Sequence, residues 1–272
     1  MTEYLEKPYL LPTAFNFEIA IPSYDRPEII KKKTLKLLND FNVPKNKIRI
    51  FLRDDQQLEK YMSVIGNEGY IFHFSGQSGI LATRNYLQVY YHEVNLNHDG
   101  VLFIDDDITH FQQMGKPLKT DFMKLMQYFF IETRMLGARL WSVSALNNAF
   151  FMSETISTSL KYCIGAFKGL ILDRTKHTIL CDVGHFEDFQ FSCEYFLEDG
   201  KVVKFNEYGI TSKYFELQGG ICGELGGMVQ RQLEMNDNQK YMIERYHGMC
   251  FPKTKKWGAD LRLSYAFKNI AL

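Results

Sequence analysis

The chain lacks an excess of either charge, a CxxC cysteine pair, and any apolar run long enough to cross a bilayer. It has 272 residues, with 32 lysines and arginines against 32 aspartates and glutamates, so no overall field draws it onto nucleic acid or a membrane. A membrane-spanning helix needs about 20 consecutive apolar residues. We therefore expect no membrane span, and Met1–Asn16 has no apolar signal-peptide core. The five cysteines are odd in number and widely spaced, which predicts reduced thiols in a cytoplasmic protein.

Apolar residues are abundant, at 46% of the chain, and are sufficient for one large packed domain over residues 1–272. In the first half, short apolar runs alternate with amphipathic stretches. This βαβαβ rhythm predicts an α/β fold with a mostly parallel, Rossmann-like sheet flanked by helices. The expected strands are 17–23, 47–52, 70–74 and 101–104. One helix is expected to begin at Pro27, and a second is expected over 79–94.

The second half gives a more mixed pattern. Its periodicity predicts helices over 121–136, 187–197 and 228–246, and strands over 139–146, 168–172 and 202–205. A glycine-rich segment, Gly219–Gly227, is expected to be a lid or acceptor-side loop, or a plain flexible loop. The segment Lys253–Arg262 is expected to be a basic tail carrying Trp257.

The strongest chemical signal is the run Val101–Ile104, which leads directly into Asp105, Asp106 and Asp107. The apolar run is typical of a buried parallel strand. Three carboxylates at its end repel one another, and a divalent cation would relieve that repulsion. Asp-x-Asp spacing lets Asp105 and Asp107 reach one cation, while Asp106 points elsewhere. A solvated loop after the strand is the alternative.

In its order of motifs, this region resembles the GT-A class of nucleotide-sugar glycosyltransferases. The first strand ends in Ile21-Pro22-Ser23-Tyr24-x-Arg26, Gly79-x-x-x-x-Arg84-Asn85 comes before the acidic strand, and Asp-x-Asp follows it. The likeness covers about the first 110 residues. It implies a GT-A fold whose first half, 1–110, binds the nucleotide sugar and whose second half, 111–272, binds the acceptor and carries the C-terminal tail.

The resemblance also implies Mn²⁺ or Mg²⁺ held by Asp105 and Asp107, and a nucleoside diphosphate sugar as donor, with UDP-glucose first among candidates. The implied nucleotide-sugar contacts are Pro22, Ser23, Tyr24, Arg26, Asp54, Asp55, Gly79, Arg84, Asp105 and Asp106. For Asp54 and Asp55 the alternative to this role is a surface turn, and for Arg84 it is a structural salt bridge.

Glu187 and Asp188 open an expected helix. Acids at a helix start are favoured by the helix dipole, which is the structural interpretation. The segment is also similar to the Glu-Asp pair that supplies the general base in many inverting GT-A enzymes, which implies Asp188 as first choice and Glu187 as second. In several GT-A families a late histidine completes the metal shell, which indicates His247, with His185 as a competitor. A histidine at a helix C-terminus is equally explained by the dipole.

The layout further resembles small GT-A proteins of phages and protists that glycosylate hydroxymethylated pyrimidines in DNA, the base J and TET-associated type. That likeness implies a hydroxymethylpyrimidine in DNA as acceptor, an inverting reaction and, for a phage-encoded chain, the host cytoplasm. Three alternatives stay open: a transferase acting on a glycan or small molecule, a nucleotidyltransferase, and a non-catalytic DNA- or glycan-binding module. The nucleotidyltransferase alternative is disfavoured because residues 22–26 lack the glycine-rich loop and lysine of that class.

Overall fold

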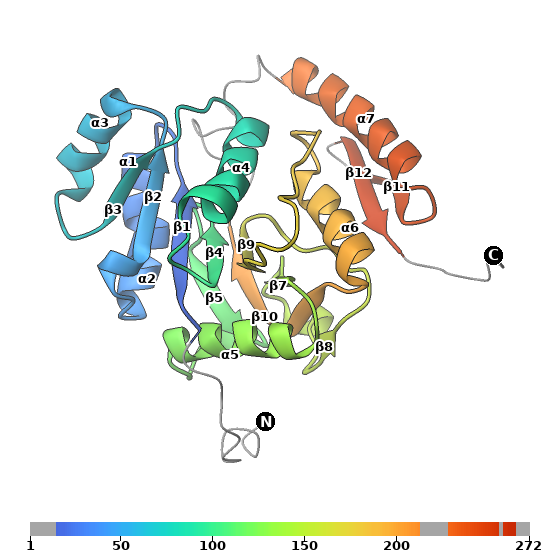
Figure 1. Ribbon diagram of the computed structural model, residues 1–272, viewed down its shortest axis with the longest axis horizontal. Coiled ribbons are helices and arrows are strands. Elements are labelled where there is room, and N and C mark those ends of the chain that lie inside the picture. The colour runs from blue at the N-terminus through green and yellow to red at the C-terminus, as the bar shows by residue number, and fades with distance from the viewer. Residues whose placement is uncertain (1–14, 213–227, 256–257, 265–272) are drawn as a thin grey trace.

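The structure is a computed structural model that describes residues 15–212, 228–255 and 258–264. Its centre is one twisted sheet that joins both halves of the chain (Figure 1). The first-half strands are mutually parallel and lie in the order β3-β2-β1-β4. They are β1 (Phe17–Pro22), β2 (Ile48–Leu52), β3 (Ile71–Phe74) and β4 (Gly100–Ile104).

The second half extends this sheet with strands of mixed direction. β9 is antiparallel to both β4 and β7, whereas β10 is parallel to β7 and antiparallel to β5. The sheet therefore continues in the order β4-β9-β7-β10-β5-β6, with β8 also paired to β10. These strands are β5 (His110–Gln113), β6 (Lys116–Pro117), β7 (Leu140–Ser144), β8 (Ile156–Ser157), β9 (Phe167–Ile171) and β10 (Val203–Thr211).

Helices cover both faces of the sheet (Figure 1). One face packs against α1 (Pro27–Ile30), the π-helical turn η2 (Lys31–Leu35), α2 (Lys36–Asp40), α3 (Asp55–Ile65) and α5 (Phe122–Met135). The other face packs against α4 (Ile80–Val89), the π-helical turn η4 (Tyr90–Val94), α6 (Glu187–Asp199) and α7 (Met228–Arg245). Two short 3₁₀ turns, Lys45–Lys47 and Ala149–Phe151, complete the helical segments.

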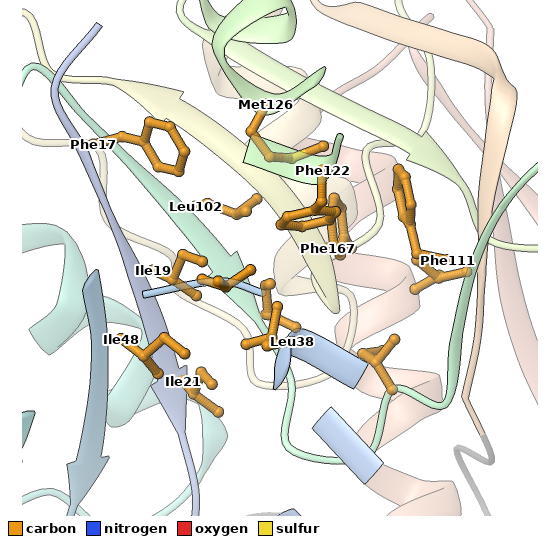
Figure 2. Close-up of a cluster of buried hydrophobic side chains, with 14 of the residues drawn as sticks. Phe17, Ile19, Ile21, Leu38, Ile48, Leu102, Phe111, Phe122, Met126 and Phe167 are labelled. Atoms are coloured by element: carbon orange, nitrogen blue, oxygen red, sulfur yellow. The ribbon is translucent and has the colours of Figure 1, made fainter. Parts of the chain in front are cut away.

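The hydrophobic core has one cluster on each face of the sheet. Figure 2 shows part of the first cluster, where Leu38 of α2 and Phe122 of α5 meet Leu102 of β4. Alternate residues of the central strands point to opposite faces, so Leu102 enters this cluster and Phe103 the other. Each fully buried side chain of this size stabilises the fold by about 1.5–3 kcal/mol, so the strands that carry the site loops are firmly held.

Two features differ from the expectations. Helix α3 fills the interval between the second and third strands, where no helix was expected. The basic tail is instead an antiparallel hairpin, β11 (Cys250–Lys255) and β12 (Gly258–Leu263), packed against α7. Gly219–Gly227 and Trp257 lie outside the described residues. Within the described ranges, no helix combines the length and the apolar character that crossing a bilayer requires.

Candidate active site

The candidate site lies at one edge of the sheet, where the parallel strands of the first half all end. Because β9 runs antiparallel to β4, its start reaches the same edge. The end of β10 arrives there too, since β10 is parallel to β7. Ligands of open α/β sheets bind beyond the carboxyl ends of the strands. The topology therefore brings loops from both halves of the chain to one place.

A small pocket opens at the ends of β1, β2 and β3. The Arg53 guanidinium lies over the Tyr24 ring, 4.4 Å from its centroid, and forms one wall. Gly79, at φ +81°, begins α4, whose first N–H groups have no side-chain cap. A helix N-terminus of this kind favours a negatively charged ligand group. The lining residues are Ser23, Tyr24, Phe51, Arg53, Ser75, Gln77, Ser78, Gly79 and Thr83.

Asp106 points inward and holds the loop that follows β1. Its carboxylate accepts a hydrogen bond from the Ser23 hydroxyl at 2.6 Å and pairs with the Arg26 guanidinium at 3.4 Å. The Tyr61 hydroxyl, 2.6 Å from Ser23, also accepts from the Arg26 backbone N–H. Burial raises the pKa of Asp106 to about 6. Asp106 and Arg26 thus organise the loop rather than line the pocket, and Pro22 is the buried last residue of β1.

Asp105 and Asp107 each use one carboxylate oxygen in a hydrogen bond within the protein. Oδ1 of Asp105 accepts from Arg84 Nη2 at 2.5 Å, and Oδ1 of Asp107 accepts from the Ser212 hydroxyl at 2.6 Å. Thr34 fixes the turn between them, because its hydroxyl donates to the Asp105 carbonyl and accepts from the Ile108 N–H. Among the described residues, neither Oδ2 atom has a hydrogen-bond partner.

This pair of carboxylates fits a divalent cation. Burial raises the pKa of Asp107, and the neighbouring charge of Asp105 raises it further. Mg²⁺ and Mn²⁺ are commonly held by one or two carboxylates together with substrate phosphates. The Oδ2 atoms of Asp105 and Asp107 would supply two such carboxylate ligands.

His247 is exposed in the turn after α7. Throughout the described part of the chain, no three histidine, cysteine, aspartate or glutamate side chains gather as a metal site. The metal role of His247 therefore stays a prediction, and its place at a helix C-terminus also fits the helix-dipole interpretation. The competing histidine, His185, lies 3.7 Å from Glu234 of α7.

Asp54 and Asp55 are placed by helix α3. Asp54 caps the helix, because its carboxylate accepts from the Gln57 N–H at 3.0 Å, and it also pairs with Arg53. Asp55 is exposed in the first turn. Neither residue lines the pocket. The neighbouring Arg53 and Gln57 N–H lower the pKa of Asp54, as expected of a capping carboxylate.

The acid pair Glu187 and Asp188 starts α6, in the second half of the chain. The preceding residue, Phe186, adopts the left-handed conformation at φ +72°. Such strain in a non-glycine residue persists only where the surroundings enforce it, and it is common at functional sites. Gly165 leaves room for both acids, since a Cβ there would lie 3.0 Å from Glu187 Oε1.

The two acids have different partners. Asp188 accepts hydrogen bonds from the Tyr162 hydroxyl at 2.5 Å and from the N–H groups of Gly165 and Phe189 at 3.3 and 3.0 Å. Glu187 lies 3.7 Å from Arg84 Nε and keeps 12% of its side chain exposed. Burial raises the pKa of each carboxyl, and for Glu187 the adjacent Asp188 adds to the effect.

Arg84 links the Asp-x-Asp turn to the acid pair. Its side chain, 4% exposed, contacts Asp105 on one side and Glu187 on the other. Burial alone would lower the pKa of Arg84, but Asp105 and Glu187 raise it above its usual value. Arg84 therefore forms the salt bridge that was the structural alternative in the sequence analysis. This salt bridge joins Asp105 of the first half to Glu187 of the second.

Sequence reasoning missed several residues that shape this site. Arg53 forms a pocket wall, Thr34 and Tyr61 fix the loops, and the second half contributes residues around the acids. An arginine at the end of the second strand was a usable signal for Arg53. The second-half residues carry no local pattern; they are Tyr162, Gly165, Lys168 and Ser212.

No family model matches the chain, and no curated protein matches its sequence. Solved structures do match. A mannosyltransferase from Pyrobaculum calidifontis, in complex with GDP-Man and Mn²⁺, superposes with a TM-score of 0.57 at 11% identity, covering 89% of this chain and 69% of its own. S. aureus TarS with UDP-GlcNAc gives 0.49 at 15% identity, covering 84% and 67%. Glucosyl-3-phosphoglycerate synthase from Mycobacterium tuberculosis, with Mn²⁺ and UDP-Glc, gives 0.49 at 10% identity, covering 92% and 86%.

Proposed function

From the site itself we propose that the protein is a metal-dependent glycosyltransferase. The mannosyltransferase match bears on the fold alone, and it confirms the expected GT-A fold with a mixed second half. The proposed enzyme would transfer a sugar from a nucleoside diphosphate sugar, with UDP-glucose as the first donor to test, to an acceptor hydroxyl. The observation that carries this proposal is the Arg84 bridge, because this one buried side chain contacts Asp105 of the Asp-x-Asp turn and Glu187 of the buried acid pair.

The proposed metal is Mn²⁺ or Mg²⁺, held by the carboxylates of Asp105 and Asp107. When bound, such an ion acts as a Lewis acid on the diphosphate and stabilises the charge that develops on the leaving nucleotide. Arg84 holds Asp105 in one orientation and Ser212 holds Asp107, so the two free oxygen atoms are set in advance. Preorganised ligands of this kind lower the cost of binding.

The donor nucleotide is proposed to occupy the pocket of β1, β2 and β3. The stacked pair of Tyr24 and Arg53 offers a flat wall for the base. Gly79 and the uncapped start of α4 offer N–H groups to a phosphate oxygen. Asp106 acts indirectly, because it holds Ser23 and Arg26 in place.

Asp188 is the proposed general base. An acceptor hydroxyl must lose its proton as its oxygen attacks the anomeric carbon, and a fixed carboxylate receives that proton. Tyr162, Gly165 and Phe189 fix the Asp188 carboxylate in one orientation. Glu187, in contrast, faces Arg84 and is proposed to position that arginine. One base and one direct displacement give an inverted anomeric centre.

The division of labour proposed for the chain follows from these roles. Residues 1–110 would bind the donor and residues 111–272 the acceptor. For the acceptor we propose 5-hydroxymethylpyrimidine in DNA, supported by the resemblance to DNA-base glycosyltransferases. A hollow of about 360 Å³ is lined by Lys32, Lys33 and Lys36. Lys32 pairs with Glu28 and Lys36 with Asp40, so Lys33 is the member of this set that supplies local positive charge for a phosphate.

Two measurements test this function in sequence. Thermal unfolding is followed with UDP-, GDP- and other nucleotide sugars, each with and without Mn²⁺. A true donor raises the unfolding temperature more with Mn²⁺ than without; no shift for any nucleotide sugar contradicts the glycosyltransferase proposal. The stabilising donor is then incubated with duplexes that contain hydroxymethylcytosine, hydroxymethyluracil or unmodified bases. Transfer only to a glycan or small molecule would move the acceptor away from DNA and keep the reaction class.

A further inference from the structure

Lys168 is a buried lysine with no hydrogen-bond partner in the described structure. It belongs to β9, opposite Phe103 of β4, and is 2% exposed. Its Nζ lies 4.0 Å from the centroid of the Phe191 ring, on α6, and none of the described residues accepts a hydrogen bond from it. Burying an unpaired ammonium costs several kcal/mol, and one cation–π contact returns only about 2 kcal/mol. Stability alone does not explain this residue.

Lys168 lies beneath the start of α6, because its Nζ is against the ring of Phe191, three residues after Asp188 on that helix. The groups that act on its charge are Arg84 of α4, Glu187 and Asp188 of α6, and Cys181 before α6. Burial lowers the pKa of Lys168 and Arg84 lowers it further, while Glu187, Cys181 and Asp188 act in the opposite direction. The ammonium therefore lies in a low-dielectric layer beneath two carboxylates, where its field reaches farther than in water.

Four groups favour the charged form of Asp188. Burial raises the pKa of its carboxyl, whereas the Tyr162 hydroxyl, the Lys168 charge and the N–H groups of Gly165 and Phe189 lower it. Tyr162 and the two N–H groups act through hydrogen bonds, so Lys168 is the cation of this set. The titratable and charged groups that act on the acid pair are Arg84, Asp105, Tyr162, Cys163, Lys168 and Cys181.

We propose that Lys168 is a positioning residue for the transfer reaction: its buried charge, set behind Asp188, keeps that carboxylate ionised at neutral pH and ready to accept a proton. The inference rests on the proposed function of Asp188 as base. This role also explains why a destabilising buried lysine is present, because functional sites often lose stability in return for activity. Lys168 does not itself touch the substrates, since the sheet and α6 enclose it.

The test compares Lys168→Met, which removes the charge and keeps the length, with Lys168→Arg, which keeps the charge. For Lys168→Met we expect the acid-side limb of the kcat profile to move to higher pH by about half a pH unit or more, because Asp188 loses its cation. Its unfolding temperature should stay equal or rise, since an unpaired charge is removed. Lys168→Arg should keep the limb near its original pH. Lys204→Met is the matched control, because Lys204 is also largely buried but donates to the Tyr162 carbonyl.

The proposal is overturned if the acid-side limb of the kcat profile stays at its original pH in Lys168→Met. It is also overturned if that limb moves as far in Lys168→Arg as in Lys168→Met. If the Met variant does not fold, Lys168→Gln replaces it with the same expectations. A second readout needs no activity: the ¹³C shift of the Asp188 carboxyl, assigned with Asp188→Asn, is titrated in wild type and variant. We expect its midpoint to rise without Lys168, and an unchanged midpoint contradicts the role. If the wild type transfers no sugar, the proposed function fails while this titration still decides about Lys168.

Discussion

The two halves of the sheet build the site in different ways. In the first half, parallel strands end at one edge, and each site residue lies within a few positions of its strand: Ser23 after β1, Arg53 after β2 and Asp105 after β4. In the second half, Asp188 is at the start of a helix, and its partner Tyr162 belongs to the segment before a strand of opposite direction. Local order in the chain predicts the first arrangement, but the second depends on how distant segments pack.

This difference matches the two roles proposed for the halves of the site. The first half presents backbone N–H groups and carboxylates at strand ends, which suits a charged nucleotide and a cation. The second half surrounds two acids with a tyrosine, a glycine and a buried lysine, which tunes proton affinity. Arg84 is the physical link, because it contacts an acid of each half. The predictions below test the halves separately, in order of expected effect.

Loss of the first-half carboxylate should have the largest effect. Asp107→Ala is expected to reduce sugar transfer about 1,000-fold or more and to abolish the Mn²⁺ dependence of nucleotide binding, because one of two metal ligands is removed. Circular dichroism should show the fold intact. Asp237→Ala, at an exposed aspartate of α7, is the control. Full activity in Asp107→Ala would refute the metal assignment.

Asp188→Asn tests the second half. Donor binding should remain, while transfer should fall roughly 100- to 10,000-fold, the usual share of general-base catalysis. Glu187→Gln should have a smaller effect on transfer and a larger one on donor affinity, because it weakens the Arg84 link. Single-turnover rates and donor titrations separate the two. A larger loss of transfer in Glu187→Gln would reverse the roles of the acids.

Gly169→Ala tests the packing that holds the second half together. A Cβ at Gly169 would lie 2.0 Å from Trp141 Cε2, and Trp141 is fully buried. We expect a loss of about 3 kcal/mol in the free energy of unfolding, measured with urea. Gly66→Ala is the comparison: it meets no atom within 4 Å but has φ +77°, so only backbone strain of about 1 kcal/mol is expected. Equal losses would contradict close packing at Gly169.

Tyr61→Phe tests the support beneath the first-half loop. It removes the hydroxyl that lies 2.6 Å from Ser23 and accepts from the Arg26 N–H. We expect the unfolding free energy to fall by about 1–2 kcal/mol, with a modest loss of donor affinity measured by calorimetry. Tyr70→Phe, whose hydroxyl meets Asn39 away from the site, should leave donor affinity unchanged. An equal loss of affinity in both variants would show that the loop does not depend on Tyr61.

His92 gives the smallest expected effect, at a place where η4 of the first half faces two arginines of the second. Burial lowers its pKa, and Arg139 and Arg174 lower it further. In the unfolded chain the His92 imidazole is protonated as the pH falls through its ordinary pKa of 6.5, whereas in the folded protein it is protonated only at lower pH. The free energy of unfolding should therefore fall below about pH 6.5. His92→Gln should reduce the fall in unfolding temperature between pH 7.5 and 5.5, and His177→Gln, at an exposed histidine, should not.

Most of the first half could be predicted from its pattern. The expected strands and the helices over 27–40 and 79–94 are present, and the Asp-x-Asp turn follows its strand as expected. Helix α3 was missed because its apolar residues are few, with a buried face formed mainly by Gln57, Tyr61 and Ile65. Asp54 was given a nucleotide role because a carboxylate at a strand end fits either a ligand or a helix cap, and only the structure shows the cap.

The second half could be predicted only in outline. Helices α5, α6 and α7 were expected within a few residues of their bounds, because their apolar positions recur at helical spacing. The direction of β9 and the hairpin of β11 and β12 were not expected. Short strands carry no mark of their partners, since pairing is decided by contacts between residues far apart in the chain. The metal role of His247 was implied by the family resemblance alone, and it stays a prediction.

The sequence by itself determined that a buried strand ends in acids suited to a cation, because apolar periodicity and charge repulsion are local properties of the chain. It also determined an α/β fold with its parallel strands in the first half. Only the tertiary structure decided which groups surround those acids. Arg84, Tyr162, Lys168 and Ser212 reach the site through sheet order and helix packing, and the pKa of a carboxyl depends on such neighbours and on burial, neither of which sequence spacing records.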